Sequence, residues 1–293
     1  MTVIELIEDA AAQLTAAGLT LADGFGQGTL NAFDEAAWLV LWRLGLPLHD
    51  LGSVSNQVVA PANRAQVATF LGARIGSRKP LAYLTNEAWL QGVPFYVDER
   101  VIIPRSFIAE LLADESIDPW LSEQTHCVLD LCTGNGSLAV LAAMAYPDVA
   151  IDAADISADA LAVARINLDK HDLAQRITLM ESDGLAACIG PYDLILCNPP
   201  YVNAAAMAAL PAEFRAEPAL ALDGNAASST DGMDFIRQLL STAAAHMSEN
   251  AVLVLEIGNE RINFERAFPK LEPLWFETSG GPDQVLLLTR QQL

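Results

Sequence analysis

The sequence predicts an α/β protein in which a mostly parallel sheet follows a helical region and a short β-hairpin. Beyond about residue 106, short apolar runs alternate with segments of helical periodicity, which is the pattern of successive βαβ units. Residues 1–80 show helical periodicity alone, interrupted by glycine and proline. The 293 residues are 52% hydrophobic and 18% charged, so the chain is long and apolar enough for about two domains with their own cores.

The first 80 residues predict a small helical bundle. Apolar residues recur at helical spacing from Val3 to Leu14 and again from Ala36 to Leu44. The next stretch, residues 81–105, carries aromatic and β-branched residues on both sides of Gly92. We therefore expect a β-hairpin there, as a connector between the helical bundle and the rest of the chain.

Residues 106–293 predict a single sheet with helices between its strands, connected by right-handed crossovers. The expected helices span 138–146 and 157–170. The seven expected strands span 128–131, 150–156, 177–181, 192–197, 251–257, 274–278 and 285–288. The last two form a hairpin appended to the sheet edge. The expected division is thus a helical domain over 1–80, a hairpin connector over 81–105 and a sheet domain over 106–293.

Composition excludes several classes of function. Lys and Arg total 16 and Asp and Glu total 37, and the net charge of −21 opposes broad nucleic-acid binding and suits a basic partner. No apolar run reaches 18 residues, and the first ten residues carry acids where a signal peptide carries positive charge. The four cysteines form no C-x-x-C pair and the four histidines are scattered. We expect no metal site, no membrane span and a cytoplasmic protein.

A glycine loop follows the first expected strand, in the order Asp130-Leu-Cys132-Thr133-Gly134-Asn135-Gly136. Glycines let the backbone turn sharply and approach a ligand, and the N–H groups of the following helix point at that ligand. Asp155 ends the next strand, 19 residues after Gly136, where a carboxylate can accept both hydroxyls of a ribose. The loop therefore predicts a nucleotide-type ligand; the alternative is a tight strand–helix turn without one.

Two cofactors fit this loop. Gly134-x-Gly136-x-x-Ala139 satisfies the dinucleotide pattern, and Asp130-x-x-x-Gly134-x-Gly136 satisfies the S-adenosylmethionine pattern. Asp130 favours the second, because an acid can hold the cationic amino end of methionine but would repel a pyrophosphate.

The fourth strand of the sheet domain ends in Asn198-Pro199-Pro200-Tyr201, and strand ends of this kind face the ligand crevice. A turn former followed by prolines is the plainer interpretation. The chemistry of a planar –NH2 acceptor explains all four residues better. The Asn198 side chain and the Pro199 carbonyl can accept its two hydrogens, and Tyr201 can pack against the planar group. Orientation alone then supplies much of the catalysis, with no strong base.

With these motifs the sequence resembles the class I S-adenosylmethionine-dependent methyltransferases that carry an (N/D)PPY motif. More narrowly, it resembles the HemK/PrmC-type protein glutamine N5-methyltransferases, from about residue 75 to the end. The residues behind this resemblance, besides the motif at Asn198, are the blocks RKPLAYLT (78–85) and FYVDERV (95–101), Pro104-Arg105-Ser106, Glu217-Pro218 and Asp231-Gly232. NPPY alone is shared with adenine methyltransferases, whereas the combination with these blocks is strongly specific.

The resemblance implies a class I, Rossmann-like seven-stranded sheet, and a helical domain and hairpin that position a protein substrate. It implies catalytic roles for Asn198, Pro199, Pro200 and Tyr201, which hold the target amide. It also implies that S-adenosylmethionine is the cofactor and that Asp183 approaches its adenine. The expected cofactor-binding residues are Asp130, Cys132, Thr133, Gly134, Asn135, Gly136, Asp155, Ile156, Asp183, Gly184 and Asn198.

Within the family, Ser106 favours the ribosomal-protein (PrmB) branch, which modifies a glutamine of ribosomal protein uL3, because the release-factor branch reads Pro-Arg-Pro-Glu-Thr here. Three features depart from the family pattern: Phe107, Gly184 where an aromatic residue is common, and an apparent insertion over 225–229. Ile156 and Leu185 are the expected substitutes for that aromatic surface. The alternatives are a release-factor methyltransferase, a nucleic-acid adenine N6-methyltransferase and a non-catalytic nucleotide-binding protein. The sequence predicts no oligomeric state.

Overall fold

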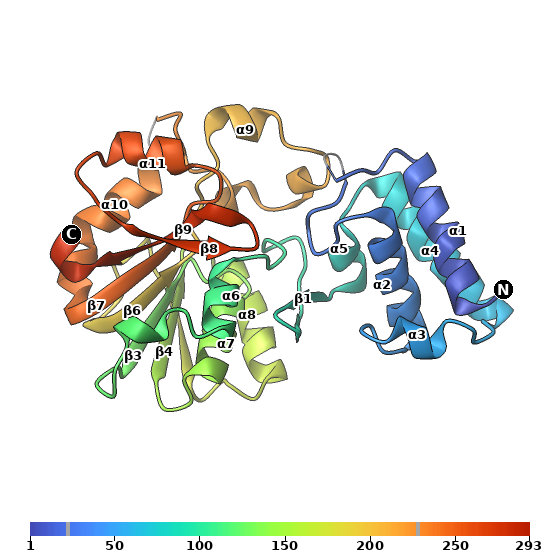
Figure 1. Cartoon of the computed structure of the whole chain (residues 1–293), viewed down its shortest axis with the longest axis horizontal. Coiled ribbons are helices and arrows are strands. Elements are labelled where there is room, and N and C mark those ends of the chain that lie inside the picture. The colour runs from blue at the N-terminus through green and yellow to red at the C-terminus, as the bar shows by residue number, and fades with distance from the viewer. Residues whose placement is uncertain (22–23, 227–228) are drawn as a thin grey trace. The chain divides into compact units, whose positions relative to one another are not determined.

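The computed structural model describes residues 1–21, 24–226 and 229–293 (Figure 1). The chain divides into two compact units. The helical unit comprises Met1–Ala88 together with Leu210–Glu217, and the sheet unit comprises Trp89–Ala209 and Pro218–Leu293. The division expected from the sequence placed residues 210–217 with the sheet domain, and the structure places them with the helices.

Among its described residues, the helical unit contains five α-helices. They are α1 (Val3–Ala16), α2 (Ala32–Leu44), α3 (Leu51–Val54), α4 (Pro61–Ser77) and α5 (Leu81–Thr85). Thr2 and Glu5 form a capping box at the start of α1, and Gly45, with φ of 64°, ends α2 in the left-handed region. These sequence-local signals set where the helices begin and end.

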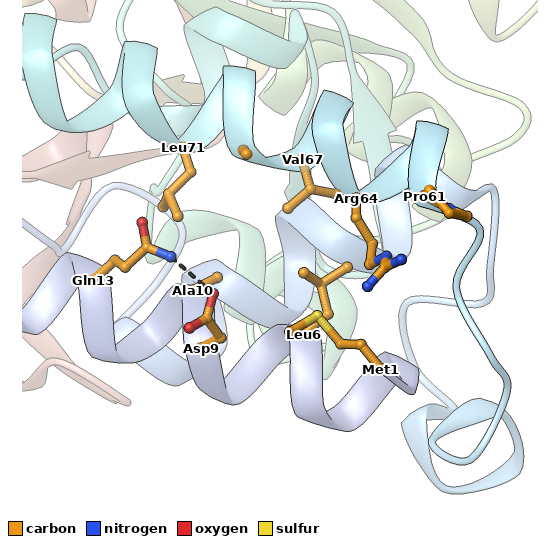
Figure 2. A pocket seen from close by; sticks show the side chains of 10 residues that line it. Met1, Leu6, Asp9, Ala10, Gln13, Pro61, Arg64, Val67 and Leu71 are labelled. Atoms are coloured by element: carbon orange, nitrogen blue, oxygen red, sulfur yellow. Dashed lines mark hydrogen bonds between the residues drawn. The ribbon is translucent and has the colours of Figure 1, made fainter.

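The core of the helical unit lies among α1, α2 and α4, since one buried cluster joins all three. Figure 2 shows α1 and α4 side by side, with Leu6 and Ala10 of α1 facing Val67 and Leu71 of α4. The expected helical bundle is therefore present in residues 1–80.

The expected hairpin lies at β1 (Ala88–Leu90) and β2 (Val93–Phe95), which form a two-stranded sheet. The first residues of the expected connector instead form α5. Pro80 precedes this helix, and Asn86 ends it with φ of 52°. Five residues are too few to show a helical period, which is why the sequence pattern indicated extended chain there.

The sheet unit contains the seven-stranded sheet that the sequence predicts, in the order β5-β4-β3-β6-β7-β9-β8. The strands from β5 to β7 are parallel, and β9 pairs antiparallel with both β7 and β8. The strand bounds are β3 Cys127–Leu131, β4 Ala150–Asp155, β5 Ile177–Glu181, β6 Tyr192–Cys197, β7 Met247–Glu256, β8 Leu274–Thr278 and β9 Gly281–Thr289. The appended edge hairpin is confirmed.

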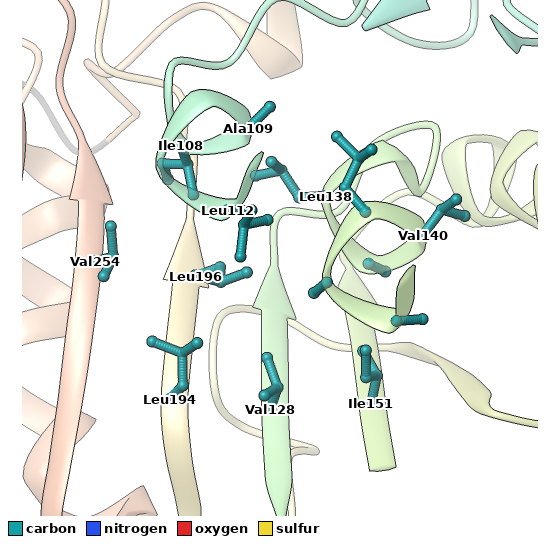
Figure 3. Packing of buried hydrophobic residues seen from close by; sticks show 14 of the residues in the cluster. Ile108, Ala109, Leu112, Val128, Leu138, Val140, Ile151, Leu194, Leu196 and Val254 are labelled. Carbon is teal, nitrogen blue, oxygen red and sulfur yellow. The ribbon is translucent and has the colours of Figure 1, made fainter. Parts of the chain in front are cut away.

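Both faces of the sheet are buried under helices, which explains why its central strands read as continuous apolar runs. Leu194 and Leu196 of β6 join one buried cluster, and Ile195 and Cys197 join the other. The helices of the unit are α6 Ile108–Ala113, α7 Ser137–Ala145, α8 Ala158–Lys170, α9 Ala204–Ala208, α10 Asp234–Thr242 and α11 Arg261–Ala267. Figure 3 shows the first cluster, in which Leu112 of α6 and Leu138 of α7 pack over the sheet beside Leu196.

Short 3-10 turns complete the elements: η1 Asp118–Trp120, η2 Phe214–Ala216, η3 Ala219–Ala221, η4 Ala243–His246 and η5 Arg290–Gln292. Two strands are clearly longer than expected: β9 spans Gly281–Thr289 rather than 285–288, and β7 begins at Met247 rather than at residue 251. The bounds of β3 and β4 differ from the expected ones by one residue at one end. In β7, Ser248, Glu249 and Asn250 are polar, which hid the start of the strand, and the Ser248 hydroxyl donates to Asp193 Oδ1 at 2.6 Å. In the described part of the chain, no helix is both long and apolar enough to cross a membrane.

Candidate active site

The candidate site lies where three neighbouring parallel strands end. In the sheet, β3 lies between β4 and β6, so the residues that follow Leu131, Asp155 and Cys197 meet at one edge. Leu131 is the register partner of Cys197, which brings the glycine loop beside Asn198. Ligands of open parallel sheets bind at this edge.

The glycine loop turns sharply at three residues with positive φ, namely Cys132 (61°), Gly134 (57°) and Gly136 (80°). A Cβ at Gly136 would lie 3.2 Å from the Ala164 side chain, so glycine there permits close packing of the loop on α8. A Cβ at Gly134 would meet nothing within 4 Å. The two glycines thus differ in their surroundings: Gly136 packs closely on α8, whereas Gly134 borders open space.

Asp130 lies at the base of the loop and is fully buried. Its Oδ2 accepts from Thr133 Oγ1 at 2.5 Å and from the Ala139 N–H at 2.9 Å. Its Oδ1 is buried and, within the described chain, has no hydrogen-bond partner. Burial raises the pKa of this carboxyl to about 7, although both hydrogen bonds oppose the shift. An acid with an open buried oxygen is suited to a cationic ligand group, whose charge would favour the carboxylate.

Asp155 ties the glycine loop to the end of β4. Its Oδ2 accepts from the Gly134 N–H at 2.9 Å, and its Oδ1 accepts from the Ser157 N–H at 2.9 Å. Burial raises the pKa of this carboxyl as well, against those backbone hydrogen bonds. Each oxygen keeps further acceptor capacity, which matches the two adjacent hydroxyls of a ribose. Ile156 follows with 49% of its surface exposed, as an apolar surface beside the acid.

Asn135, an expected cofactor-binding residue, is bound by Asn167, a residue that the sequence analysis did not single out. The side-chain Nδ2 of Asn135 is buried and, among the described atoms, unpartnered, while its backbone carbonyl accepts from Asn167 Nδ2 at 2.8 Å. Asn167 also accepts from the Tyr96 N–H at 2.7 Å, so it links the loop to the residue that follows β2. An asparagine among Ala160, Val163 and Ala164 on the buried stripe of α8 was the available sequence signal.

The expected adenine side of the site lies at Asp183 and Gly184, after β5. Asp183 is exposed and Gly184 has φ of 55°. Leu185, an expected substitute for the missing aromatic, is 4% exposed and packs in the core. Phe235 of α10 lies beside Gly184 instead, with its ring 3.8 Å from the position of a Cβ there. Phe235 belongs to a different element from Gly184, so the spacing around residue 184 gave no means to predict this neighbour.

The acceptor motif, Asn198 to Tyr201, leaves the end of β6 with Asn198 half-buried and Pro199 buried. Tyr201 lies in a tight cradle of glycines. A Cβ at Gly258 would come within 2.6 Å of its ring, and a Cβ at Gly232 would come within 2.1 Å of its carbonyl oxygen. Glycine at both positions therefore lets the chain pack closely around Tyr201.

Glu256 ends β7 beneath this motif and was not singled out by the sequence. It is 2% exposed, and its Oε2 accepts from Ser106 Oγ at 2.5 Å and from the Phe107 N–H at 2.9 Å. The Tyr201 hydroxyl lies 3.5 Å from Glu256 Oε1. Burial raises the pKa of Glu256 to about 7, against these hydrogen bonds and the charge of Arg105. The missed signal was an acid at the end of an apolar strand: Glu256 is the last residue of β7 as Asp155 is of β4, and Asp130 lies one residue before the end of β3.

These residues fit S-adenosylmethionine. The open oxygen of Asp130 is matched to the amino group of the methionine part, the carboxylate of Asp155 to the ribose, and the open space at Gly134 to a closely bound ligand. Within the described residues, no group of three or more His, Cys, Asp or Glu side chains is placed to hold a metal ion.

Comparison with known proteins agrees with the class that this fold and site define. The family model described as "Methyltransferase small domain" matches residues 110–225. The catalytic domain of human METTL16, solved with an RNA hairpin, superimposes with a TM-score of 0.51 at 11% sequence identity. The match covers 78% of this chain and 81% of that one, and it shows the fold alone. The chain is an S-adenosylmethionine-dependent methyltransferase of class I fold.

Curated relatives define the family more narrowly. The chain is 49% identical to the ribosomal protein uL3 glutamine methyltransferase of Bordetella pertussis, over all of this chain and 96% of that protein. It is 47% identical to the protein of the same name from Burkholderia pseudomallei and 46% identical to that from Neisseria meningitidis serogroup A. These two matches also span all of this chain, with 95% and 94% of the relatives covered. The chain belongs to the family of ribosomal protein uL3 glutamine methyltransferases.

Proposed function

We propose that this enzyme transfers the methyl group of S-adenosylmethionine to the side-chain amide nitrogen of a glutamine in ribosomal protein uL3. The observation that carries the proposal is the position of Asn198: it follows β6 at the strand end next to the glycine loop, and its motif is Asn-Pro-Pro-Tyr. Relatives that are 46–49% identical over the whole chain carry the corresponding name.

The acceptor side works by orientation. The Asn198 side-chain oxygen and the Pro199 carbonyl accept the two hydrogens of the target amide, and the Tyr201 ring packs against its plane. An amide nitrogen is a weak nucleophile, because its lone pair is delocalised into the carbonyl. The two hydrogen-bond acceptors orient the nitrogen lone pair toward the methyl group of the donor. They also stabilise the positive charge that develops on nitrogen. The proton is lost after methylation, when the nitrogen has become acidic.

The donor side uses the eleven residues expected from the sequence, with Phe235 added as an aromatic surface beside Gly184. S-adenosylmethionine supplies an electrophilic methyl group on a sulfonium. Asp130 and Asp155 bind its amino group and its ribose, and the loop at Gly134 and Gly136 lets the backbone approach it. Ile156, Asp183 and Gly184 line the adenine, and Cys132, Thr133 and Asn135 complete the loop. No side chain of this set is asked to act as a nucleophile or as a base.

Charge supports a basic protein substrate, met in the cytoplasm before rRNA covers it. The sheet unit contains 27 acidic and ten basic residues, whereas the helical unit contains ten acidic and six basic residues. The unit that holds the acceptor motif thus carries most of the net charge of −21. Such a field attracts a free ribosomal protein and repels nucleic acid. The helical unit then contributes substrate recognition rather than chemistry.

Intact-mass analysis of purified uL3 after incubation with enzyme and S-adenosylmethionine tests the proposal. We expect a mass increase of one methyl group, which peptide mapping places on a glutamine side chain. A release factor offered under the same conditions is the comparison substrate, and a reaction without the donor is the control. Methylation of the release factor but not of uL3 would overturn the substrate assignment. Methylation of an adenine in RNA or DNA would overturn the acceptor class.

A further inference from the structure

The structure assigns a positioning role to Leu210–Glu217, a segment that we call the clamp segment. We propose that it fixes the acceptor motif to the helical unit through Glu213, Arg74 and Arg78, so that these three are positioning residues for methyl transfer. The inference rests on the proposed function, since it concerns how the amide-binding motif of that reaction is held.

The clamp segment is held in the helical unit by a buried cluster of charges. Glu213 is fully buried, and its carboxylate accepts from Arg78 through both oxygens, at 2.6 Å from Nε and 3.1 Å from Nη2. Its Oε1 also accepts from Arg74 Nη1 at 3.1 Å. The backbone carbonyl of Glu213 accepts from Gln27 Nε2 at 3.3 Å. Glu213 is thus bound from α4, from its C-cap residue Arg78 and from the segment before α2.

Arg74 is the centre of this cluster and is 1% exposed. Besides Glu213, it donates to Glu35 Oε1 at 2.8 Å and to the Gly24 carbonyl at 2.6 Å. Burial alone would raise the pKa of Glu213, yet the hydrogen bonds from Arg78 and Arg74 hold it below its ordinary value. The Glu213 carboxylate therefore favours its charged form. Burial raises the pKa of the Glu35 carboxyl, against the charge and hydrogen bond of Arg74.

We expect this charge cluster to fix the position of the clamp segment on the helices more than to add to the free energy of unfolding. Ion pairs among buried side chains such as Glu35, Arg74 and Glu213 give little net free energy compared with apolar side chains of the same size, but removal of one partner is costly because it leaves the other buried and unpaired. Here the pair of Arg74 and Glu213 joins residues separated by 139 positions in the sequence. The chain leaves the sheet unit after Ala209 and returns to it at Pro218, and the charge cluster attaches this short excursion to the helices of its own unit.

Both ends of the excursion lead to the acceptor motif. Val202, the residue after Tyr201, donates its N–H to the Leu222 carbonyl at 2.8 Å, and its own carbonyl accepts from the Gly224 N–H at 3.2 Å. Residues 202–223 therefore form a loop whose two ends are hydrogen-bonded beside Tyr201 and whose tip is the clamp segment. A helical unit that binds the protein substrate also holds this loop, which couples substrate position to the position of the amide-binding residues.

Arg78→Met is the variant that tests the coupling in the full-length enzyme, because Arg78 is 30% exposed and its loss leaves Arg74 on Glu213. Arg78→Lys is the conservative variant. Arg43→Met is the matched control, since Arg43 lies on α2 and donates to Gln66 of the same unit. The measurements are kcat and KM for uL3, affinity for S-adenosylmethionine, and hydrogen exchange at the Val202 amide.

We expect Arg78→Met to lower kcat by roughly 10- to 100-fold, as a displaced reacting group does, with donor affinity unchanged. The Val202 amide should exchange faster, Arg78→Lys should recover part of kcat, and Arg43→Met should match the parent. Parental kcat in Arg78→Met, or equal losses of kcat and donor affinity, would overturn the inference while leaving the proposed function intact. A parent enzyme that methylates no uL3 would overturn the proposed function, and the inference with it.

Discussion

Three acids lie at the ends of strands, with Asp155 and Glu256 as the last residues of β4 and β7 and Asp130 one residue before the end of β3. Their hydrogen-bond partners distinguish them. Asp155 has a backbone N–H on each oxygen, and Asp130 has two donors on one oxygen and none on the other within the described structure. Glu256 accepts from the chain around Ser106 and lies under Tyr201. Burial raises the pKa of all three. Only Asp130 therefore keeps a buried acceptor open for a cation, which fits the amino end of the methyl donor.

Replacement of Asn198 should separate catalysis from donor binding. Asn198→Ala removes one positioned acceptor, so turnover should fall by roughly 10²–10³, or about 3–4 kcal/mol. Asn198→Asp should retain more activity than Ala, because a carboxylate still accepts a hydrogen bond. Donor affinity should change much less in both, since the residue faces the acceptor. Single-turnover rates and donor titrations measure the two quantities. Turnover at the parental rate in the Ala variant would exclude Asn198 as the amide-binding residue.

Glu256 should make the stability of the fold depend on pH. Its folded pKa of about 7 lies above the ordinary value of 4.5, because burial disfavours the charge. Below pH 4.5 the carboxyl is protonated in both states. As pH rises from 4.5 to 7 the unfolded chain loses this proton first, so the free energy of unfolding falls. The full loss, about 3 kcal/mol at 1.36 kcal/mol per pKa unit, is reached above pH 7.

Glu256→Gln tests this dependence, since the amide keeps hydrogen-bonding groups for Ser106 and Phe107 but does not titrate. Arg105 and Tyr201, the neighbouring titratable groups, stay unchanged. Urea unfolding at pH 4.5 and pH 8 should show the variant gaining stability relative to the parent at the higher pH. The exposed Glu265→Gln is the control. An equal stability difference between Gln variant and parent at both pH values would contradict the assignment.

At the scale of elements, two substitutions in the glycine loop should affect different quantities: one mainly the free energy of unfolding, the other mainly the affinity for the donor. Gly136→Ala forces a side chain into positive φ and against Ala164, so the free energy of unfolding should fall by about 2 kcal/mol or more. Gly134→Ala adds a methyl group in open space at a similar φ. It should cost about 1–2 kcal/mol of stability but weaken donor binding at least about tenfold, because the ligand needs that space. Chemical denaturation and calorimetry distinguish the two; similar donor affinities for the folded variants would refute the distinction.

The strands were predictable and the polar links between elements were not. An apolar run such as Leu194 to Cys197 predicts a strand that is buried on both faces, and this prediction needs no information from the rest of the chain. The link from Asn167 to Tyr96, or from Arg74 to Glu213, exists only once the chain has folded, because its partners are far apart in sequence. Helix α5 was missed for a different reason: five residues show no helical period, and its local signals were limited to Pro80 before it and the cap at Asn86.

The candidate site divides in the same way. Asp130, Gly134, Asp155 and Asn198 were identifiable because each lies in a short motif at the end of an apolar strand. Phe235 was not, since it reaches the site from α10 rather than from the segment around Gly184. The expected insertion over 225–229 falls partly on residues 227–228, which lie outside the described structure. Asn225 itself is described, and its Nδ2 donates a hydrogen bond to the carbonyl of Val202, the residue after the acceptor motif, at 2.9 Å.

At the scale of the whole molecule, the two units have separate cores. One buried cluster lies wholly in the helical unit, among residues such as Ile7, Leu39 and Leu71, and the two clusters of the sheet unit contain none of its members. The residues that we propose to bind the donor all belong to the sheet unit. We therefore propose donor binding and substrate recognition for two units whose hydrophobic cores are separate.

A chain that starts at Trp89 should therefore fold and bind S-adenosylmethionine but fail to methylate its protein substrate. Donor affinity should stay within about threefold of the parent, a difference below 1 kcal/mol, because Asp130, Asp155 and the glycine loop keep their contacts. Methylation of uL3 should fall by at least about 100-fold in kcat/KM, because the truncation removes the substrate-recognition unit and the arginines that bind Glu213. Circular dichroism establishes the fold, calorimetry the donor affinity, and mass analysis the methyl transfer. If the folded truncated protein methylates uL3 at the parental rate, substrate recognition lies in the sheet unit; if it binds no donor, the units are not independent.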